Sequence, residues 1–171
     1  MVPIRRPDQG GQPELEHCMI VFVIRHADKK LSPPSADGLT PAGVKRAELL
    51  ARMLADSGIS VAYCSTAQRA RQTLAPLKAR LGTKLSVKTV SIDGTGQPDK
   101  HVDQIVGAVQ QLQPDAVVGV VSHSDTVPLI LEALGGGTID PIGDTEFDKL
   151  FVLLDGPAGK TLLRLRYGDA T

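Results

Sequence analysis

Cysteine is scarce in this chain of 171 residues, which contains only Cys18 and Cys64. Two cysteines, one of them within an apparent core strand, exclude a disulfide framework and a cysteine-rich metal knuckle. An excess of charge is also missing, because 19 basic side chains balance 19 acidic ones. No overall field therefore favours nucleic acid or an anionic membrane as a partner. The apolar run from Met19 to Ile24 is too short for a membrane span and unlike a signal peptide. We expect a cytoplasmic protein that binds anions only locally.

Strands and helices alternate along the chain. Residues 1–16 lack periodicity and contain a glycine pair and three prolines, which predicts a flexible leader before a single domain over 17–171. Apolar or strand-forming runs predict strands at 19–24, 61–64, 85–92 and 116–121. Helical spacing predicts helices at 40–58, 66–81, 102–112 and 126–134, the second kinked or broken near Pro76. The end of the chain predicts a hairpin of 150–154 and 161–166. The pattern indicates an α/β fold with three layers, a mostly parallel sheet covered by helices on both faces.

Polar side chains follow directly after several predicted strands. Arg25 and His26 end the first strand, Ser65 ends the second, and His123 follows the strand at 116–121. In open α/β sheets, ligands bind beyond the carboxyl ends of the strands, so we expect these side chains to share one site.

A second arginine is expected at the same site. Arg69 lies four residues from both Ser65 and Thr73 and shares their helix face, whereas Arg71 is turned roughly 200° away from Arg69. Two guanidinium groups can fork onto the oxygens of a phosphate, and a neutral imidazole between them can attack phosphorus. These groups can supply the positive charge that phosphoryl transfer needs, so we predict no metal and no cofactor.

The order and spacing of these motifs resemble the histidine phosphatase superfamily, also called phosphoglycerate mutase-like. The resemblance is carried by four segments, Arg25–Ala27, Leu39–Gly43, Ser65–Thr73 and Ser122–Thr126. The compact length is similar to that of the small bacterial members, such as the phosphohistidine phosphatases. Residues 146–150 also look like a recurring feature of some small members, without an assigned chemical role.

The resemblance implies a phosphoglycerate mutase-like fold and a role for each matching residue. His26 is then the nucleophile that forms a transient phosphohistidine. Arg25 and Arg69 are phosphate clamps, and His123 is a further donor to the phosphate. The substrate is a phosphorylated small molecule or a phosphoprotein.

The proton donor for the leaving group is left open by the sequence. Larger members of the family use an acidic residue after the third strand, and the nearest positional match is Asp93. Asp28 and Asp125 also lie near the predicted strand ends, and any of the three could instead be a turn or cap residue.

Other polar residues have simpler interpretations. Ser65 is interpreted as a helix cap and Thr73 as a residue that packs or bonds to its own backbone. His17 and His101 are interpreted as solvated polar positions.

The short segment 93–100 predicts an open pocket that accepts phosphomonoesters or protein phosphohistidine. Two alternatives remain, a phosphate- or phosphoprotein-binding scaffold on the same fold, and a phosphomutase. The open pocket disfavours the mutase, because transfer back to product requires exclusion of water. The sequence does not specify an oligomeric state.

Overall fold

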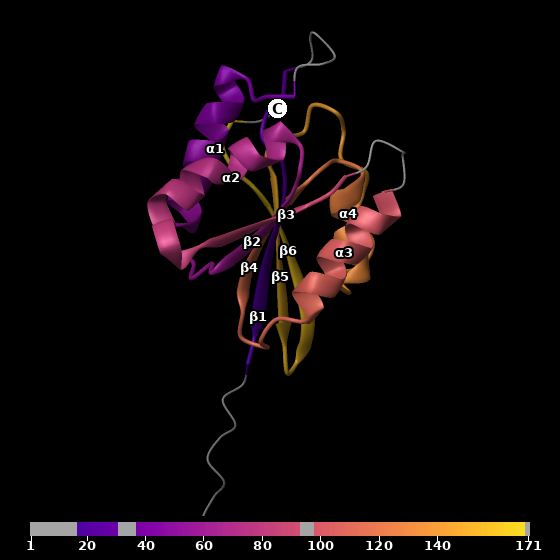
Figure 1. Cartoon of the computed structure of the whole chain (residues 1–171). Coiled ribbons are helices and arrows are strands. Elements are labelled where there is room, and N and C mark those ends of the chain that lie inside the picture. The colour runs from indigo at the N-terminus through magenta and orange to yellow at the C-terminus, as the bar shows by residue number, and fades with distance from the viewer. Residues whose placement is uncertain (1–16, 31–36, 93–97, 170–171) are drawn as a thin grey trace, which may run out of the picture.

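The computed structural model describes residues 17–30, 37–92 and 98–169, so the expected leader 1–16 lies outside the described residues. One six-stranded sheet lies between two pairs of helices (Figure 1). The strands are β1 (Met19–Arg25), β2 (Val61–Ser65), β3 (Ser86–Val90), β4 (Val117–Ser122), β5 (Lys149–Gly156) and β6 (Gly159–Arg166). The helices are α1 (Pro41–Leu54), α2 (Gln68–Leu81), α3 (Pro98–Gln110) and α4 (Thr126–Ala133), with a 3₁₀ turn at Gly82–Lys84.

The sheet has the strand order β3-β2-β4-β1-β5-β6. The first four strands in this order pair in parallel, β5 runs antiparallel to β1, and β6 runs antiparallel to β5. The parallel strands are connected through helices, as parallel pairing requires, whereas the antiparallel hairpin needs only a short turn. The expected mostly parallel sheet and its C-terminal hairpin are therefore confirmed.

The two faces of the sheet are covered by different helices. Figure 1 shows α1 and α2 on one side and α3 and α4 on the other. Side chains along β1 alternate between the two cores, since Val21 and Val23 pack with residues of α3 and α4 while Ile24 packs with residues of α1 and α2. This alternation explains why the strand is continuously apolar, because both of its faces are buried. No helix among the described residues is long and apolar enough to cross a membrane.

The helix ends follow the expected chemistry, with one exception. Thr40 caps α1 by accepting a hydrogen bond from the backbone N–H of Gly43 at 3.0 Å, and Pro41 is the first helical residue. Pro76 was expected to kink or break α2, and the helix is not broken, since it continues from Gln68 to Leu81 with Pro76 inside it. Apolar residues on both sides of Pro76, including Leu74 and Leu77, are buried against the sheet, and this packing supports the helix where proline removes a hydrogen bond.

The glycine of the Leu39–Gly43 motif is required by a close approach between two backbone segments. A Cβ atom added to Gly43 would lie 2.2 Å from the carbonyl oxygen of Asp28. The same carbonyl accepts a hydrogen bond from the backbone N–H of Thr40 at 2.9 Å. The absence of a side chain at Gly43 therefore lets α1 start directly against the segment that follows β1 and His26.

We predict that Gly43→Ala destabilises the protein by about 1–3 kcal/mol, because the new methyl group must displace backbone atoms. Gly107 in α3 is the matched control, since an added Cβ there meets nothing within 4 Å. Gly107→Ala should be neutral or stabilising by up to about 1 kcal/mol, because alanine favours helix. The free energies of unfolding in urea measure both effects, and equal values for the two variants would contradict the packing argument.

Candidate active site

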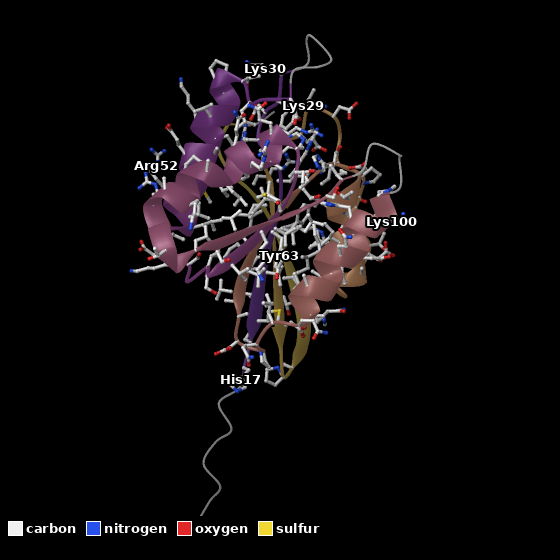
Figure 2. The ribbon with its side chains drawn as sticks, in the orientation of Figure 1. His17, Lys29, Lys30, Arg52, Tyr63 and Lys100 are labelled. Atoms are coloured by element: carbon white, nitrogen blue, oxygen red, sulfur yellow. The ribbon has the colours of Figure 1, made fainter. Side chains whose placement is uncertain are left out.

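The register of the sheet brings the two predicted histidines together. In the pairing of β1 with β4, Arg25 lies opposite Ser122, so His26 and His123 are the next residues of adjacent strands. The backbone N–H of His26 donates to the carbonyl of Ser122 at 2.9 Å. The two imidazole rings meet edge to face with their centroids 5.2 Å apart. The site therefore lies at the carboxyl edge of the parallel strands, the end where Figure 2 shows Lys29, with His17 at the opposite end.

The ring of His26 is buried and held in one tautomer. Its Nδ1 lies 2.8 Å from the carbonyl oxygen of Ala27, and because a carbonyl only accepts, Nδ1 carries the proton. Nε2 then has a lone pair, and it has no hydrogen-bond partner in the described part of the chain. Burial lowers the pKa of His26 from its ordinary value to about 3, and the nearby positive groups contribute to the shift. The side chain is thus neutral at pH 7, as a nucleophile must be.

His123 is held by two partners. Its Nδ1 lies 3.2 Å from Nη2 of Arg69, and its Nε2 lies 2.8 Å from Oγ of Ser65. A guanidinium only donates, so Nδ1 accepts and Nε2 donates to the serine hydroxyl. Burial, followed by the charge of Arg69, lowers the pKa of His123 to about 4. Two neutral imidazoles therefore lie side by side.

Arg69 reaches the site from the first turn of α2. Its Nη1 forms an ion pair with Asp37, and its Nη2 contacts His123. The carboxylate of Asp37 also accepts a hydrogen bond from the backbone N–H of Gln68. Because the N-cap residue of α2, Ala67, makes no side-chain capping hydrogen bond, Asp37 caps α2 and orients Arg69 at the same time.

Arg25 is only 2% exposed and is held by the loop before β5. Its Nη1 donates to the carbonyls of Gly143 at 2.6 Å and Glu146 at 3.0 Å, and its Nη2 donates to the carbonyl of Asp144 at 2.8 Å. The guanidinium also lies over the ring of Phe147, 4.2 Å from its centroid. Residues 146–150 had no assigned chemical role. Their first two members, Glu146 and Phe147, hold the side chain of Arg25 in place.

The two arginines share an unusual feature. Among the described residues, the buried side-chain nitrogen and oxygen atoms without a hydrogen-bond partner are Nε of Arg25, Nε of Arg69 and Oη of Tyr167. A buried donor without a partner costs about 1–3 kcal/mol. Each guanidinium has five N–H groups, so Arg25 with three hydrogen bonds and Arg69 with two keep terminal N–H groups as well as Nε–H that no described residue accepts. Two positive guanidinium groups near two neutral imidazoles fit an oxyanion such as phosphate.

Ser65 and Thr73 take part in the site in different ways. Ser65 was interpreted as a helix cap, and this is wrong, because its hydroxyl contacts His123 and the N-cap residue of α2 is Ala67. Thr73 bonds to its own helix as expected, donating to the carbonyl of Arg69 at 2.8 Å. Its hydroxyl also accepts from the backbone N–H of Ala27 at 3.0 Å. Thr73 thereby connects the arginine-bearing turn of α2 to the residue that holds the His26 ring.

The three candidate proton donors have different surroundings. Asp93 lies outside the described residues. Asp28 pairs with Nε of Arg46 at 2.7 Å, a contact that fixes α1 and not the site. Asp125 is exposed at the start of α4 and makes no capping hydrogen bond. Its negative charge acts to raise the pKa of both His123 and Arg25, which indicates that it lies near the site.

His101 was expected to be solvated, and this is wrong, because only 1% of the residue is exposed. Its ring lies 6.3 Å from that of His123. A histidine beside Asp99 and Lys100 in the sequence gives no indication of burial, since only the turn of α3 directs it inward. Within the described segments, no group of three or more histidine, cysteine, aspartate or glutamate side chains could hold a metal ion.

Part of the chain matches a family of known proteins in sequence, and solved structures share its fold. Residues 21–91 match the model of the histidine phosphatase superfamily, branch 1. Arg25, His26 and Arg69 lie inside the matched segment, and His123 lies beyond it. No curated protein matches the chain in sequence.

Three solved structures illustrate the likeness in fold. A candidate phosphohistidine phosphatase SixA from Nakamurella multipartitia has a TM-score of 0.59 and 27% identity, covering 89% of this chain and 98% of that chain. The protein histidine phosphatase SixA complexed with tungstate has a TM-score of 0.61 and 24% identity, covering 86% of this chain and 97% of that one. A mycobacterial glucosyl-3-phosphoglycerate phosphatase has a TM-score of 0.60 and 14% identity, covering 90% of this chain and 100% of that chain. The expected phosphoglycerate mutase-like fold is thus confirmed.

We predict that Arg69→Ala weakens the binding of tungstate, a stand-in for phosphate, by about tenfold or more, because a hydrogen bond to a charged group contributes roughly 1.5–3 kcal/mol. Arg71 lies two residues away in the same helix, is exposed, and is the matched control. Arg71→Ala should leave the dissociation constant unchanged within about twofold, since an exposed charge contributes little. Isothermal titration calorimetry measures both, and equal losses in the two variants would contradict the assignment of Arg69.

Proposed function

We propose that this chain, which matches the histidine phosphatase superfamily over residues 21–91 and shares its fold with a SixA structure, is a phosphatase that transfers the phosphoryl group of its substrate to His26. One observation carries the proposal. The neutral Nε2 of His26 has no partner in the described part of the chain, and two buried guanidinium N–H groups nearby also have none. A nucleophile without a partner distinguishes this site from one that only binds phosphate, because binding alone needs no free lone pair.

The first step forms a bond between Nε2 of His26 and phosphorus. The bond from phosphorus to the leaving atom breaks, and its electron pair remains on that atom, which takes up a proton. Arg25 and Arg69 donate to the phosphoryl oxygens, whose charge they stabilise in the transition state. A dianionic phosphate raises the pKa of His123, and a protonated Nδ1 gives up its hydrogen bond from Arg69 and donates to a third oxygen.

The second step returns the enzyme to its resting state. A water molecule attacks phosphorus, the bond to Nε2 of His26 breaks, and the electron pair returns to the imidazole. Inorganic phosphate leaves, and the proton lost by water goes to solvent or to the phosphate. The hydrogen bond from Nδ1 to Ala27 keeps the ring in the same tautomer throughout both steps.

Protein phosphohistidine and phosphomonoesters are the proposed substrates. A phosphohistidine can be protonated on its own ring before the bond breaks, so it needs no acid from the enzyme, whereas an alkyl ester benefits from one. Asp93 is the proposed acid for esters, and the exposed Asp125 is the alternative that the charges around His123 support. The scarcity of cysteine, with Cys18 and Cys64 both unpaired, supports the cytoplasm as the proposed location.

We predict that brief reaction with ³²P-labelled substrate leaves label on the protein that is released by acid and stable to alkali, because a phosphoramidate hydrolyses when it is protonated. His26→Ala should abolish the label. His17→Ala, which removes an exposed histidine at the opposite end of the molecule, is the matched control and should keep it. Phosphohistidine protein and an alkyl phosphate, used in parallel, identify the preferred class by their labelling rates. Label that survives acid, or that remains in His26→Ala, would disprove the nucleophile.

A further inference from the structure

His101 belongs to a chain of hydrogen bonds that starts at the exposed Ser91 and is buried from His101 to His123. In the first turn of α3, Lys100 is exposed to solvent (Figure 2), whereas the next residue, His101, points inward. Nδ1 of His101 lies 3.2 Å from the carbonyl oxygen of Ser91, just after β3, and Nε2 lies 2.9 Å from Oγ of Ser122, at the end of β4. In the sheet, β2 lies between β3 and β4. The ring of His101 therefore bridges the carboxyl ends of two strands that are not neighbours.

The chain continues from Ser122 to the second histidine of the site. Oγ of Ser122 lies 2.7 Å from Oγ1 of Thr126, and the same threonine oxygen accepts a hydrogen bond from the backbone N–H of His123 at 3.1 Å. Ser122 and Thr126 are fully buried. Solvent is therefore not available to replace a partner that Ser122 or Thr126 loses.

The carbonyl of Ser91 determines which group donates and which accepts in each hydrogen bond from His101 to His123. Because the carbonyl of Ser91 only accepts, Nδ1 of His101 donates, and Nε2 of the neutral ring must accept from the hydroxyl of Ser122. The oxygen of Ser122 is then left to accept from the hydroxyl of Thr126, whose own oxygen accepts from His123. Each hydroxyl donates once and accepts once, and such satisfied buried networks hold their members in one arrangement.

We propose that His101 is a positioning residue for His123, a role that rests on the proposed phosphatase function. His101 fixes the hydroxyl groups of Ser122 and Thr126, and these fix the backbone from which the His123 ring extends toward His26 and Arg69. The ring of His123 has its own contacts to Ser65 and Arg69. The chain from His101 therefore sets the place from which His123 reaches the phosphate, and the contacts of the ring set its orientation.

The geometry also explains why histidine suits this position. The two ring nitrogens are held at a fixed separation, so one rigid side chain bridges Ser91 and Ser122, which belong to segments that are not neighbours in the sheet. Asparagine can reproduce the donor at Nδ1 and glutamine the acceptor at Nε2, but neither reproduces both. The two substitutions therefore separate the bond to Ser91 from the bond to Ser122.

Two single substitutions test the chain. His101→Asn keeps the donor to Ser91 and loses the acceptor for Ser122, and we expect it to lower kcat by about tenfold or more with little change in KM, because small displacements of a site group have large effects on rate. His101→Gln keeps the acceptor for Ser122 and should stay within about threefold of the wild type. Ser122→Ala interrupts the chain at its middle and should match His101→Asn.

The double variant of His101→Asn and Ser122→Ala should lose no more than either single variant, because the second change acts on a chain that is already broken. Val106→Ala is the control for simple loss of packing in α3, since Val106 is buried in the core on that face of the sheet. It should lower the melting temperature without lowering kcat. The chemical shift of the His123 ring should move in His101→Asn and Ser122→Ala but not in Val106→Ala.

Two results would overturn the positioning role. One is a kcat within twofold of the wild type in His101→Asn, with a melting temperature reduced as in Val106→Ala. The other is an additive loss in the double variant, which would show that the two residues act separately. If the wild-type protein has no turnover, the proposed phosphatase function fails, and the His123 shift and tungstate affinity of the same variants still decide whether His101 positions His123.

Discussion

Burial of polar nitrogen groups at one edge of the sheet is the constraint on which the arrangement of this site depends. His26, His123 and Arg25 are almost fully removed from solvent, although each would be well hydrated in an unfolded chain. Burial lowers the pKa of both histidines, so the rings stay neutral beside two positive guanidinium groups. The folded protein therefore has a lone pair on His26 and an excess of buried hydrogen-bond donors, which together favour a bound anion.

The rest of the fold supplies partners for the other nitrogens of the two arginines. The loop before β5 satisfies the terminal nitrogens of Arg25 with carbonyl oxygens, and Asp37 and His123 satisfy those of Arg69. Each guanidinium is thus fixed in position while some of its N–H groups are accepted by no described residue, which gives two rigid donor groups. Rigid donors stabilise a developing charge better than mobile ones, because they need not reorganise during the reaction.

The sequence predicted the framework well because its information is local there. Apolar runs, the cap at Thr40 and the spacing of Arg69 from Ser65 depend on residues close together in the chain, and the resemblance to the histidine phosphatase superfamily is confirmed. Contacts between distant segments could not be predicted. The capping of α2 by Asp37, the holding of Arg25 by residues 143–146 and the burial of His101 all depend on how far-apart loops meet over the strand ends. Contacts between loops that are far apart in the sequence leave no periodic pattern of residues. The interpretations of His101 and Ser65 were therefore wrong.

The central claim is that Nε2 of His26 and the guanidinium groups of Arg25 and Arg69 act on one oxyanion. A crystal structure of the protein soaked in tungstate tests it most directly. We predict tungsten within bonding distance of Nε2 of His26, with one tungstate oxygen accepting from the guanidinium of Arg25 and another from that of Arg69. Tungstate bound away from His26, or without a hydrogen bond to either guanidinium, would contradict it.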